Sequence, residues 1–454
     1  MPSAILSSDI GTSSLKAAFI DPGGNLLAFS RASYPAGAHA AVWEEAFAGA
    51  LEKLRAQAPG CLIDGICFSG NGPTLVPVSL EGQALPPLYW NDGRILLPPV
   101  GGLSFFLPHV AWFKENEPTK YEKLGFFVSS HEWLASRIGA EVVTVLPQSS
   151  YKPWYWDDEQ CDLFGLDIKK FPPFVKMGSL IGRVSAEAAR RFPALKSGTP
   201  IISGGPDFIT ALIGTGTLKT GDVCDRAGSS EGINVCAGEK GASSVRAADG
   251  MGLRVLPHVK AGFWNIGALI PMSGRLFDWY RSFTGQEGRS YEELLTELIP
   301  SDKGTEIFEG RFFFPGEQDF PDNTSLGRAV LCAIAFAVRG AVELLDGWGF
   351  PVRKMMVSGG QGKNPRWNQL KADITGVTIM VPEIQDGELA GNAVLSALAL
   401  DSSAGREGHL DSIAARMIRV REVYEPKSEN ALFWEERYTQ YRKLLESAPE
   451  GNKA

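Results

Sequence analysis

The stretch Asp9-Ile10-Gly11-Thr12-Ser13-Ser14-Leu15-Lys16, close to the start of the chain, says most about the fold. It lies between two apolar, strand-like runs, so it reads as a hydroxyl-lined turn of a hairpin. Such a turn offers backbone N–H groups and hydroxyls to an anion, and an acidic residue at the strand end can hold Mg²⁺ through water. The residues alone leave a second interpretation open, in which the aspartate satisfies local backbone donors of a polar hairpin.

A second stretch of the same kind covers residues 221–236, where Gly228-Ser229-Ser230 separates two more strand-like runs. We interpret the pair as a weak internal repeat, with two similar halves that each open on a hairpin. The boundary is expected near residues 214–220, which gives domains of residues 1–217 and 218–454. A chain of 454 residues is long enough for two such domains.

Helical and strand-like segments alternate after the first hairpin, which predicts an α/β fold. Strands are expected over 64–78 and 352–357 and helices over 43–56, 326–345, 366–375, 387–400 and 429–446. Residues 291–320 have poor periodicity and many Phe, Gly, Pro and Asp residues, which predicts a loop or cap.

The composition excludes several classes of protein. The formal net charge of -8 leaves no excess of positive charge for binding nucleic acid or an anionic membrane surface. The expected partners are therefore small molecules. The six cysteines are scattered without a CxxC pair, which is typical of a reducing cytoplasm. The N-terminal residues show no signal-peptide pattern, and no apolar stretch approaches the roughly 20 residues that span a bilayer. We therefore expect a cytoplasmic protein.

Asp207 ends the strand-like run Ile201-Ile202-Ser203-Gly204-Gly205-Pro206 and precedes an apolar, helix-like one. A carboxylate at such a strand-to-helix junction can project into a cleft. From position alone the usual role of Asp before a helix, an N-cap, is favoured.

Two further segments carry polar side chains suited to binding. In the run from Ser358 to Pro365, residues without Cβ allow close approach to a nucleotide, and Asn364 can hydrogen-bond a base or ribose. The run Trp90-Asn91-Asp92-Gly93-Arg94 can bind several hydroxyls. An ordinary glycine-rich turn and an internal Asp92–Arg94 pair are the alternatives.

Other nucleotide and metal motifs are missing from the sequence. Gly362-Lys363 is not part of a Walker A pattern, no G-x-G-x-x-G occurs, and the five histidines lack metal-ligand spacing. Residues 228–232 do match the G-x-S-x-G nucleophile elbow of α/β-hydrolases, with Ser230 as the serine. That elbow needs a helix after the serine, whereas the next residues read as a strand, so a hydrolase is the lesser alternative.

Taken together and in order, these segments resemble the FGGY carbohydrate kinase family over nearly the whole chain, with xylulokinase-like features. Asp9 to Lys16 is similar to its first phosphate motif, and Gly228-Ser229-Ser230 to its second, usually Gly-Thr-Ser. Residues 64–74 and 88–94 resemble its sugar-binding stretch and W-x-D-x-R element, and Gly204 to Asp207 the strand end that carries the catalytic aspartate. Residues 358–373 are similar to its adenosine motif.

The resemblance implies two ribonuclease-H-like domains of the actin/hexokinase ATPase type with an active-site cleft between them. The first would carry the sugar site and the first phosphate motif, and the second would bind the nucleotide. By resemblance, ATP would contact Gly11, Thr12, Ser13, Lys16, Gly228, Ser229, Ser230, Gly359, Gly360 and Asn364. The substrate would contact Asn71, Gly72, Pro73, Trp90, Asp92, Arg94, Asp207 and Phe208. Asp9 and Asp207 would hold Mg²⁺ in its water shell, with Asp207 as the general base.

The implied function is ATP-dependent phosphorylation of a sugar or polyol, with a ketopentose such as xylulose as the single best substrate prediction and a homodimer as the possible assembly. The family's xylulose kinases typically carry Met-His after Ser-Gly-Gln, where this chain has Asn71 followed by Gly72-Pro73. Phe208 also stands where the kinases often place a polar side chain, which predicts a narrower site or a less polar polyol. A nucleotide-binding relative without transfer activity remains the main alternative.

Overall fold

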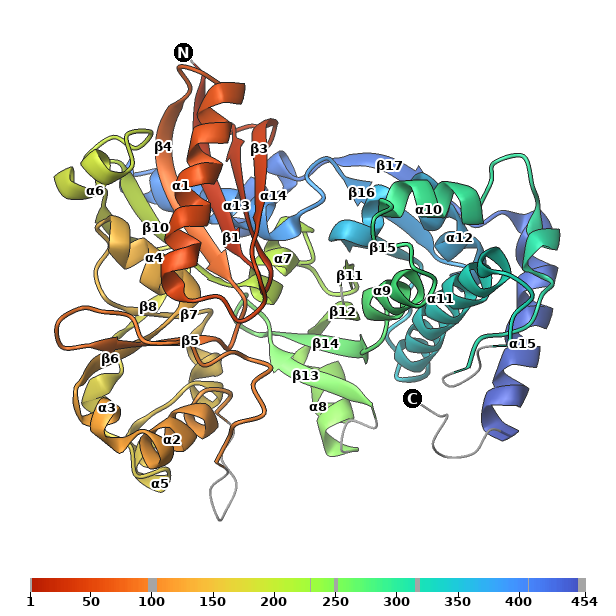
Figure 1. Ribbon diagram of the computed structural model, residues 1–454, viewed down its shortest axis with the longest axis horizontal. Helices are drawn as coiled ribbons and strands as arrows, with labels where there is room; N and C mark the ends of the chain where they lie inside the picture. Colours follow the sequence, from red (N-terminus) through yellow and green to blue (C-terminus); the bar gives the residue numbers. More distant parts are fainter. Residues whose placement is uncertain are drawn as a thin grey trace. The chain divides into compact units, whose positions relative to one another are not determined.

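The computed structural model describes residues 2–96, 104–228, 230–248, 252–314, 319–406 and 408–447 of the chain. They belong to two compact units, drawn in Figure 1. The first consists of Met1–Leu218, Pro257–Ala261 and Asp386–Arg419, and the second of Lys219–Leu256, Gly262–Gln385 and Val420–Ala454.

The first unit contains a six-stranded mixed sheet in the order β3-β2-β1-β4-β10-β9. The strands β1, β2 and β3 form an antiparallel meander, β4 and β10 run parallel to β1, and β9 closes the edge antiparallel to β10. Their bounds are β1 Ser3–Ile10, β2 Ser14–Ile20, β3 Leu26–Ser33, β4 Leu62–Gly70, β9 Leu180–Arg183 and β10 Pro200–Pro206.

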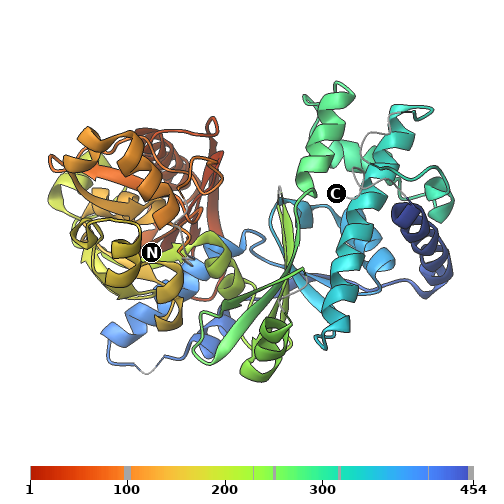
Figure 2. The ribbon, with the colours of Figure 1, turned by 90° about the horizontal axis from the view of Figure 1, so that it is seen from below.

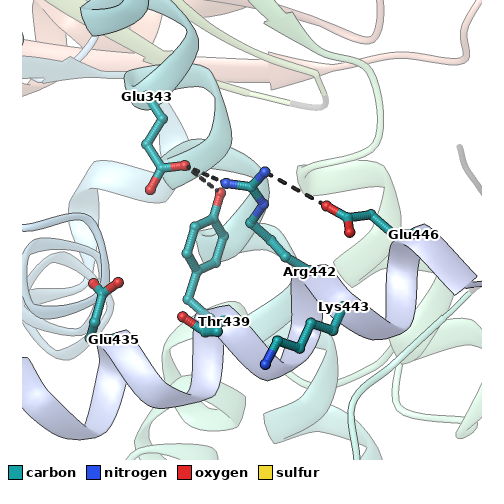
Figure 3. A pocket seen from close by; sticks show the side chains of 7 residues that line it. Glu343, Glu435, Thr439, Arg442, Lys443 and Glu446 are labelled. Atoms are coloured by element: carbon teal, nitrogen blue, oxygen red, sulfur yellow. Dashed lines mark hydrogen bonds and ion pairs between the residues drawn. The ribbon is translucent and has the colours of Figure 1, made fainter.

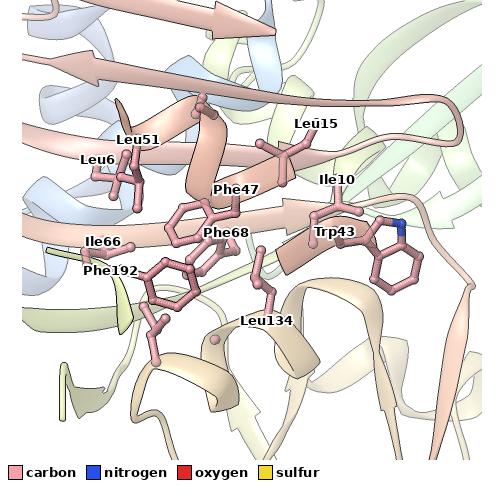
Figure 4. Packing of buried hydrophobic residues seen from close by; sticks show 14 of the residues in the cluster. Leu6, Ile10, Leu15, Trp43, Phe47, Leu51, Ile66, Phe68, Leu134 and Phe192 are labelled. Carbon is pink, nitrogen blue, oxygen red and sulfur yellow. The ribbon is translucent and has the colours of Figure 1, made fainter. Parts of the chain in front are cut away.

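Helices cover this sheet because its central strands are apolar on both faces. On β4, Ile66 and Phe68 join Phe47 of α1 (Ala40–Gln57) in one core cluster, which Figure 4 shows. Cys67, which points to the opposite face, packs with Ala399 of α13 (Gly387–Ser403). The side-chain period of two therefore places alternate residues of β4 against α1 and α13.

Between β4 and β9 the first unit carries a smaller lobe with two short two-stranded sheets. Its core is aromatic, with Trp156 against Phe171 and Phe174 at ring-centroid distances of 4.7 and 5.4 Å. The elements are β5 Leu75–Ser79, α2 Leu107–Asn116, α3 Pro118–Glu122, β6 Leu124–Ser129, α4 Ser130–Ile138, β7 Thr144–Leu146, η1 Ser149–Trp154, α5 Asp158–Leu163, η2 Ile168–Lys170 and β8 Phe174–Lys176. The helices α6 Ala186–Arg191, α7 Asp207–Gly214 and α14 Leu410–Met417 complete the unit.

The second unit repeats the arrangement with a seven-stranded sheet in the order β13-β14-β12-β11-β15-β16-β17. Here β11 and β12 form the hairpin, β14 extends it antiparallel, and β15 and β16 run parallel to β11. This confirms the internal repeat inferred from the two hairpins. The bounds are β11 Val223–Ala227, β12 Glu231–Gly238, β13 Leu253–Pro257, β14 Phe263–Ile270, β15 Lys354–Ser358, β16 Thr378–Pro382 and β17 Val420–Tyr424.

The long helix α11 (Asn323–Gly347) packs Val338 and Leu345 on the sheet of the second unit. Further N-terminal on α11, Phe336 packs with Trp434 and Tyr438 of α15 (Ala431–Ser447), and Figures 1 and 2 show these two helices side by side. The other elements are α8 Glu239–Ala247, α9 Gly274–Phe283, α10 Tyr291–Leu298, η3 Thr305–Phe308, η4 Gly360–Lys363, α12 Pro365–Thr375 and η5 Ser428–Asn430. None of the helices in the described ranges is long and apolar enough to cross a membrane.

The segment 291–320, predicted as a loop or cap, is in part helical. Residues Tyr291–Leu298 form α10, whose first turn is closed by reciprocal hydrogen bonds between Ser290 and Glu293. Residues 315–318 lie outside the described part. The prediction was wrong for α10 because it relied on periodicity and overlooked the Ser-x-x-Glu capping box.

The chain also divides differently from the single boundary expected at residues 217 and 218. The chain first passes from the first unit to the second between Leu218 and Lys219, close to the expected boundary. Residues Asp386–Arg419, however, belong to the first unit again. They return because α13 packs along α7 and under the central strands, where the Ser7 hydroxyl donates to the Leu389 carbonyl at 2.8 Å.

Candidate active site

Three predicted site residues come together at one edge of the first sheet. The strands β1, β4 and β10 are parallel neighbours, with Asp9 opposite Ser69 and Pro206 opposite Gly70. Asp9, Asn71 and Asp207 therefore lie at or directly after the carboxyl ends of adjacent strands, the edge at which open α/β sheets bind ligands.

Asp9 is buried and surrounded by charge. Its Oδ1 accepts a hydrogen bond from the Ser69 hydroxyl at 2.8 Å, and its Oδ2 lies 3.7 Å from the Lys16 ammonium. Burial raises the pKa of the Asp9 carboxyl to about 7, against the lowering effect of Lys16, and the charges of Glu388 and Asp207 raise this pKa further. The Lys16 ammonium therefore favours the charged form of Asp9, whereas burial and the neighbouring carboxylates disfavour it.

Lys16 lies among more carboxylates than it can neutralise. Its ammonium is 3.1 Å from Asp386, 3.7 Å from Glu388 and 3.7 Å from Asp9. These negative charges raise the pKa of Lys16 despite its burial, so it stays protonated. We did not predict Asp386 or Glu388 from the sequence, because nothing local links the start of α13 to a hairpin more than 350 residues earlier.

Asp207 is the first residue of α7, directly after β10. Pro206 occupies the N-cap position, and the Asp207 Oδ1 accepts a hydrogen bond from the amide of Phe208 at 2.7 Å. Asp207 and Phe208 are both half-buried. The carboxylate thus lies in the first turn of the helix, where negative charge is favoured, rather than at the N-cap.

The turn between β1 and β2 is closed by its own backbone. The Gly11 amide donates to the Ser14 carbonyl at 2.9 Å, and the Tyr34 hydroxyl donates to the Gly11 carbonyl at 2.8 Å. Thr12 and Ser13 remain partly or fully exposed at the tip. The turn therefore presents its hydroxyl side chains outward.

The segment from Trp90 to Arg94 contains the internal pair that the sequence left as an alternative. The Arg94 Nε donates to both oxygens of Asp92 at 2.9 Å, and its guanidinium lies 4.7 Å from the ring centre of Trp112. The Trp90 indole N–H donates to the Thr12 hydroxyl at 3.3 Å. A hollow of about 310 Å³ adjoins this segment and is lined by Thr12, Ala36, Gly37, Pro86, Pro87, Tyr89, Asn91, Asp92 and Arg94.

Asn71 is buried where β4 ends. Its Oδ1 accepts a 3.3 Å hydrogen bond from Ser130, whereas its Nδ2 has no partner within the described residues. Gly72 lies against Pro206, because a Cβ on Gly72 would stand 3.2 Å from the Pro206 side chain. The Asn71 Nδ2 is therefore a buried hydrogen-bond donor without an acceptor among the described residues at this edge of the sheet.

In the second unit the hairpin turn and the loop after β15 lie beside each other. Strands β11 and β15 are parallel, with Arg226 opposite Ser358. Gly359 has a φ of +101°, and a Cβ there would stand 2.6 Å from the Ala227 carbonyl oxygen. A Cβ on Gly360 would meet nothing within 4 Å, so the backbone is open at that point.

Asn364 has a structural role that the sequence analysis did not consider, as the N-cap of α12. Its Oδ1 caps α12, accepting from the amides of Arg366 at 3.0 Å and Trp367 at 3.1 Å. Gly228 and Ser230 lie in the hairpin turn, while Ser229 lies outside the described residues. The strand β12 begins at Glu231, so no helix follows Ser230 and the structural requirement of a hydrolase elbow is not met.

The predicted residues are thus distributed over both units. The first holds Asp9, Gly11, Thr12, Ser13, Lys16, Asn71, Gly72, Pro73, Trp90, Asp92, Arg94, Asp207 and Phe208, and the second holds Gly228, Ser230, Gly359, Gly360 and Asn364. Among the described residues there is no group of three or more His, Cys, Asp or Glu arranged to bind a metal ion directly.

Figure 3 shows a separate hollow of about 270 Å³ in the second unit, between α11 and α15. Glu343 accepts from the Tyr438 hydroxyl at 3.1 Å and pairs with Arg442 at 3.5 Å. Its lining residues are Glu343, Glu435, Tyr438, Thr439, Arg442, Lys443 and Glu446. These contacts tie α15 to α11, and none of the predicted site residues lies there.

Known proteins resemble this chain along most of its length. The sequence profile of the N-terminal domain of the FGGY family of carbohydrate kinases matches residues 103–214, and that of the C-terminal domain matches residues 309–400. The xylulose kinase of Lactococcus lactis is 23% identical, over 98% of this chain and 97% of that protein.

Two solved structures show the fold. The gluconate kinase of Lactobacillus acidophilus is 17% identical, with a TM-score of 0.77 over the full length of both chains. The glycerol kinase of Plasmodium falciparum, solved with ADP, is also 17% identical, with a TM-score of 0.77 over 98% of each chain. The molecule therefore has the two-domain actin/hexokinase-type fold of the sugar kinases.

Proposed function

Because this chain belongs to the FGGY family of carbohydrate kinases, we propose that it transfers the terminal phosphoryl group of ATP to a hydroxyl of a sugar or polyol, with Asp207 as general base. The observation that carries the proposal is the convergence of Asp9, Asn71 and Asp207 at the carboxyl edge of three parallel strands. Phosphoryl transfer depends mainly on positioning and charge, and this edge supplies both.

Asp207 is suited to accept the proton of the attacking hydroxyl. Its place in the first turn of α7 fixes its backbone, and the residue is only half-buried. A positioned base of this kind typically contributes about 10²–10⁴ in rate.

The carboxylates around Lys16 fit a magnesium ion. Asp9, Asp386 and Glu388 outnumber the one ammonium, and the charge of Asp207 also acts on Asp9. Carboxylate oxygens and water are the ligands that Mg²⁺ prefers. In this proposal Asp9 and Asp207 hold the ion through water. The ion would neutralise part of the phosphate charge.

The two turns are the proposed phosphate-binding elements. Gly11, Thr12 and Ser13 of the first turn, with Lys16 of β2, and Gly228, Ser229 and Ser230 of the second would bind the phosphates. Gly359, Gly360 and Asn364 would face the adenosine. The open backbone at Gly360 supports this assignment, as does the ADP in the related glycerol kinase.

For the acceptor we propose a ketopentose such as xylulose, because the Lactococcus relative is a xylulose kinase. Asn71, Gly72, Pro73, Trp90, Asp92, Arg94 and Phe208 would form the pocket. The unpartnered Nδ2 of Asn71 is a donor for a sugar hydroxyl, whereas Gly72-Pro73 and Phe208 make the pocket less polar than in typical xylulose kinases. A reducing cytoplasm fits the six buried cysteines, and a homodimer stays a prediction from the sequence.

The test is a mass-spectrometric screen of pentuloses, hexuloses and polyols with Mg-ATP, combined with measurement of ADP release. We expect one class of acceptor to be phosphorylated. The absence of any phosphorylated acceptor, with ATP still bound, would instead favour the nucleotide-binding relative without transfer activity.

The role of Asp207 is tested with Asp207→Asn. Turnover is expected to fall by at least about 10²-fold, with the melting temperature unchanged. Asp157→Asn is the matched control, because Asp157 caps α5 through a 2.9 Å hydrogen bond to the Gln160 amide and has no place in the proposed reaction. Full turnover in Asp207→Asn would show that Asp207 is not the general base.

A further inference from the structure

Gln361 joins two separate segments of the second unit. Its Nε2 donates to the Gly228 carbonyl at 2.9 Å and to the Ser273 hydroxyl at 2.8 Å. Gly228 lies in the hairpin turn directly after β11, and Gln361 lies in the short η4 helix after β15. One side-chain amide therefore connects the turn to the loop.

Through Ser273, Gln361 is linked to a fully buried cluster of charged residues. The Ser273 hydroxyl donates to Glu231 at 2.5 Å, and the Lys371 ammonium lies 2.6 Å from Glu231 and 2.7 Å from Asp225. The side chains of all three charged residues have no exposed surface. Paired charges in such an interior are held in place, because separating them leaves an uncompensated buried charge.

This cluster sets the direction of the hydrogen bonds at Gln361. Since the Ser273 proton goes to the Glu231 carboxylate, the Ser273 oxygen can only accept from its other neighbour. The amide end of Gln361 that faces Ser273 must then be the NH₂ group, which also donates to Gly228. The Gly228 carbonyl further accepts from the Gly274 amide at 3.2 Å, so two donors hold it.

We propose that Gln361 is a positioning residue for nucleotide binding, which anchors the Gly228 turn and the Gly359–Asn364 loop to the Asp225–Lys371–Glu231 cluster. The inference rests on the proposed function, in which this turn and loop bind the phosphates and the adenosine. A site that is held in its bound geometry before the ligand arrives loses less freedom on binding.

The expected effect is a weaker nucleotide complex without a change in acceptor binding. Replacing Gln361 by Met keeps the length of the side chain and removes both donated hydrogen bonds. Their loss should raise the dissociation constant of ADP roughly tenfold, as expected for one or two neutral hydrogen bonds. The Michaelis constant for the sugar should stay within about twofold.

Gln286, which follows helix α9 in the second unit, provides a matched control. Its Nε2 also donates two hydrogen bonds, to the hydroxyls of Tyr280 at 3.2 Å and Thr284 at 2.8 Å, and none of these residues belongs to the turn, the loop or the proposed sites. Gln286→Met should therefore lower the thermal stability and leave the ADP affinity unchanged.

The experiment is calorimetric titration of ADP with Mg²⁺ into the full-length wild type, Gln361→Met, Gln286→Met, Ser273→Ala and the double variant Ser273→Ala/Gln361→Met. Coupling through Ser273 predicts that the double variant binds about as weakly as Gln361→Met alone. Unchanged affinity in Gln361→Met, or equal weakening in both Gln variants, would overturn the inference. A wild type that binds no adenine nucleotide would instead refute the proposed function.

Discussion

Gly359 shows how one backbone conformation constrains the loop after β15. With φ at +101° and the Ala227 carbonyl oxygen 2.6 Å from any Cβ, Gly359→Ala must strain the backbone and displace β11. We expect a loss of about 1–3 kcal/mol of unfolding free energy, together with weaker nucleotide binding. Gly360→Ala is the control, because its Cβ would meet nothing within 4 Å. Similar melting temperatures for the two variants would contradict this account.

Glu132 gives a pH prediction at the same scale. Burial raises the pKa of this carboxyl to about 7, although its oxygens accept hydrogen bonds from the amides of Ser129 at 2.6 Å and Val145 at 2.5 Å. Between pH 4.5 and 7 the folded state keeps a proton that the unfolded state releases. The stabilisation is therefore complete below about pH 4.5 and is lost as the pH rises through 7.

Glu132→Gln removes this titration, so it isolates the effect from other groups. The stability of the wild type relative to Glu132→Gln should fall between pH 5 and pH 8, by at most about 3 kcal/mol. Calorimetric melting temperatures of both proteins across this range give the difference. Parallel curves would show that Glu132 is already ionised at pH 5.

Lys371 connects three elements, since it extends from α12 to Asp225 on β11 and Glu231 on β12. Lys371→Met would leave two buried carboxylates without a cation. We expect it to cost about 3–5 kcal/mol, and the cost should be reduced when Asp225→Asn and Glu231→Gln neutralise the carboxylates in the same chain. Chemical denaturation of the single and triple variants measures both effects. A triple variant no more stable than Lys371→Met would argue against an electrostatic origin.

The elements themselves follow mostly from local sequence. The two hairpins, the long helix α11 and the helices α12, α13 and α15 lie close to where periodicity and turn residues predict them. The missed helix α10 is also locally encoded, by the Ser290 and Glu293 capping box. Caps depend on contacts three residues apart, so such elements can be read from the sequence.

At the scale of the whole molecule, we expect ADP and the sugar to protect different segments of the chain from hydrogen exchange. In hydrogen exchange, ADP should protect the turn around Gly228 and residues 358–364 of the second unit, and a bound sugar should protect residues 70–73 and 90–94 of the first. Asp207→Asn should keep both patterns, because it removes a base and not a binding surface. Protection of residues 70–73 and 90–94 by ADP, or of residues 358–364 by the sugar, would contradict the assignment of the two sites.

The candidate site was less predictable than the elements. The order of the motifs indicated Asp9 and Asp207, but each of them had a plausible local role, as a turn residue or a helix cap. Asp386 and Glu388 carried no recognisable motif, and they reach Lys16 only because α13 crosses back into the first unit. Gln361 and Lys371 lie within residues 358–373, the segment similar to the adenosine motif, but the sequence analysis assigned them no role.

The sequence by itself determined the α/β class and the two hairpins with their polar turns, because turns, caps and periodicity depend on neighbours along the chain. The order of its motifs also carried the resemblance to the FGGY carbohydrate kinases. Only the tertiary structure decided which charged groups share an environment. Strand pairing brought Asp9, Asn71 and Asp207 to one edge, and helix packing placed Asp386 beside Lys16 and Lys371 beside Glu231. Electrostatic interactions act over a few ångströms of space whatever the separation in sequence, so these pairings appear only when the chain has folded.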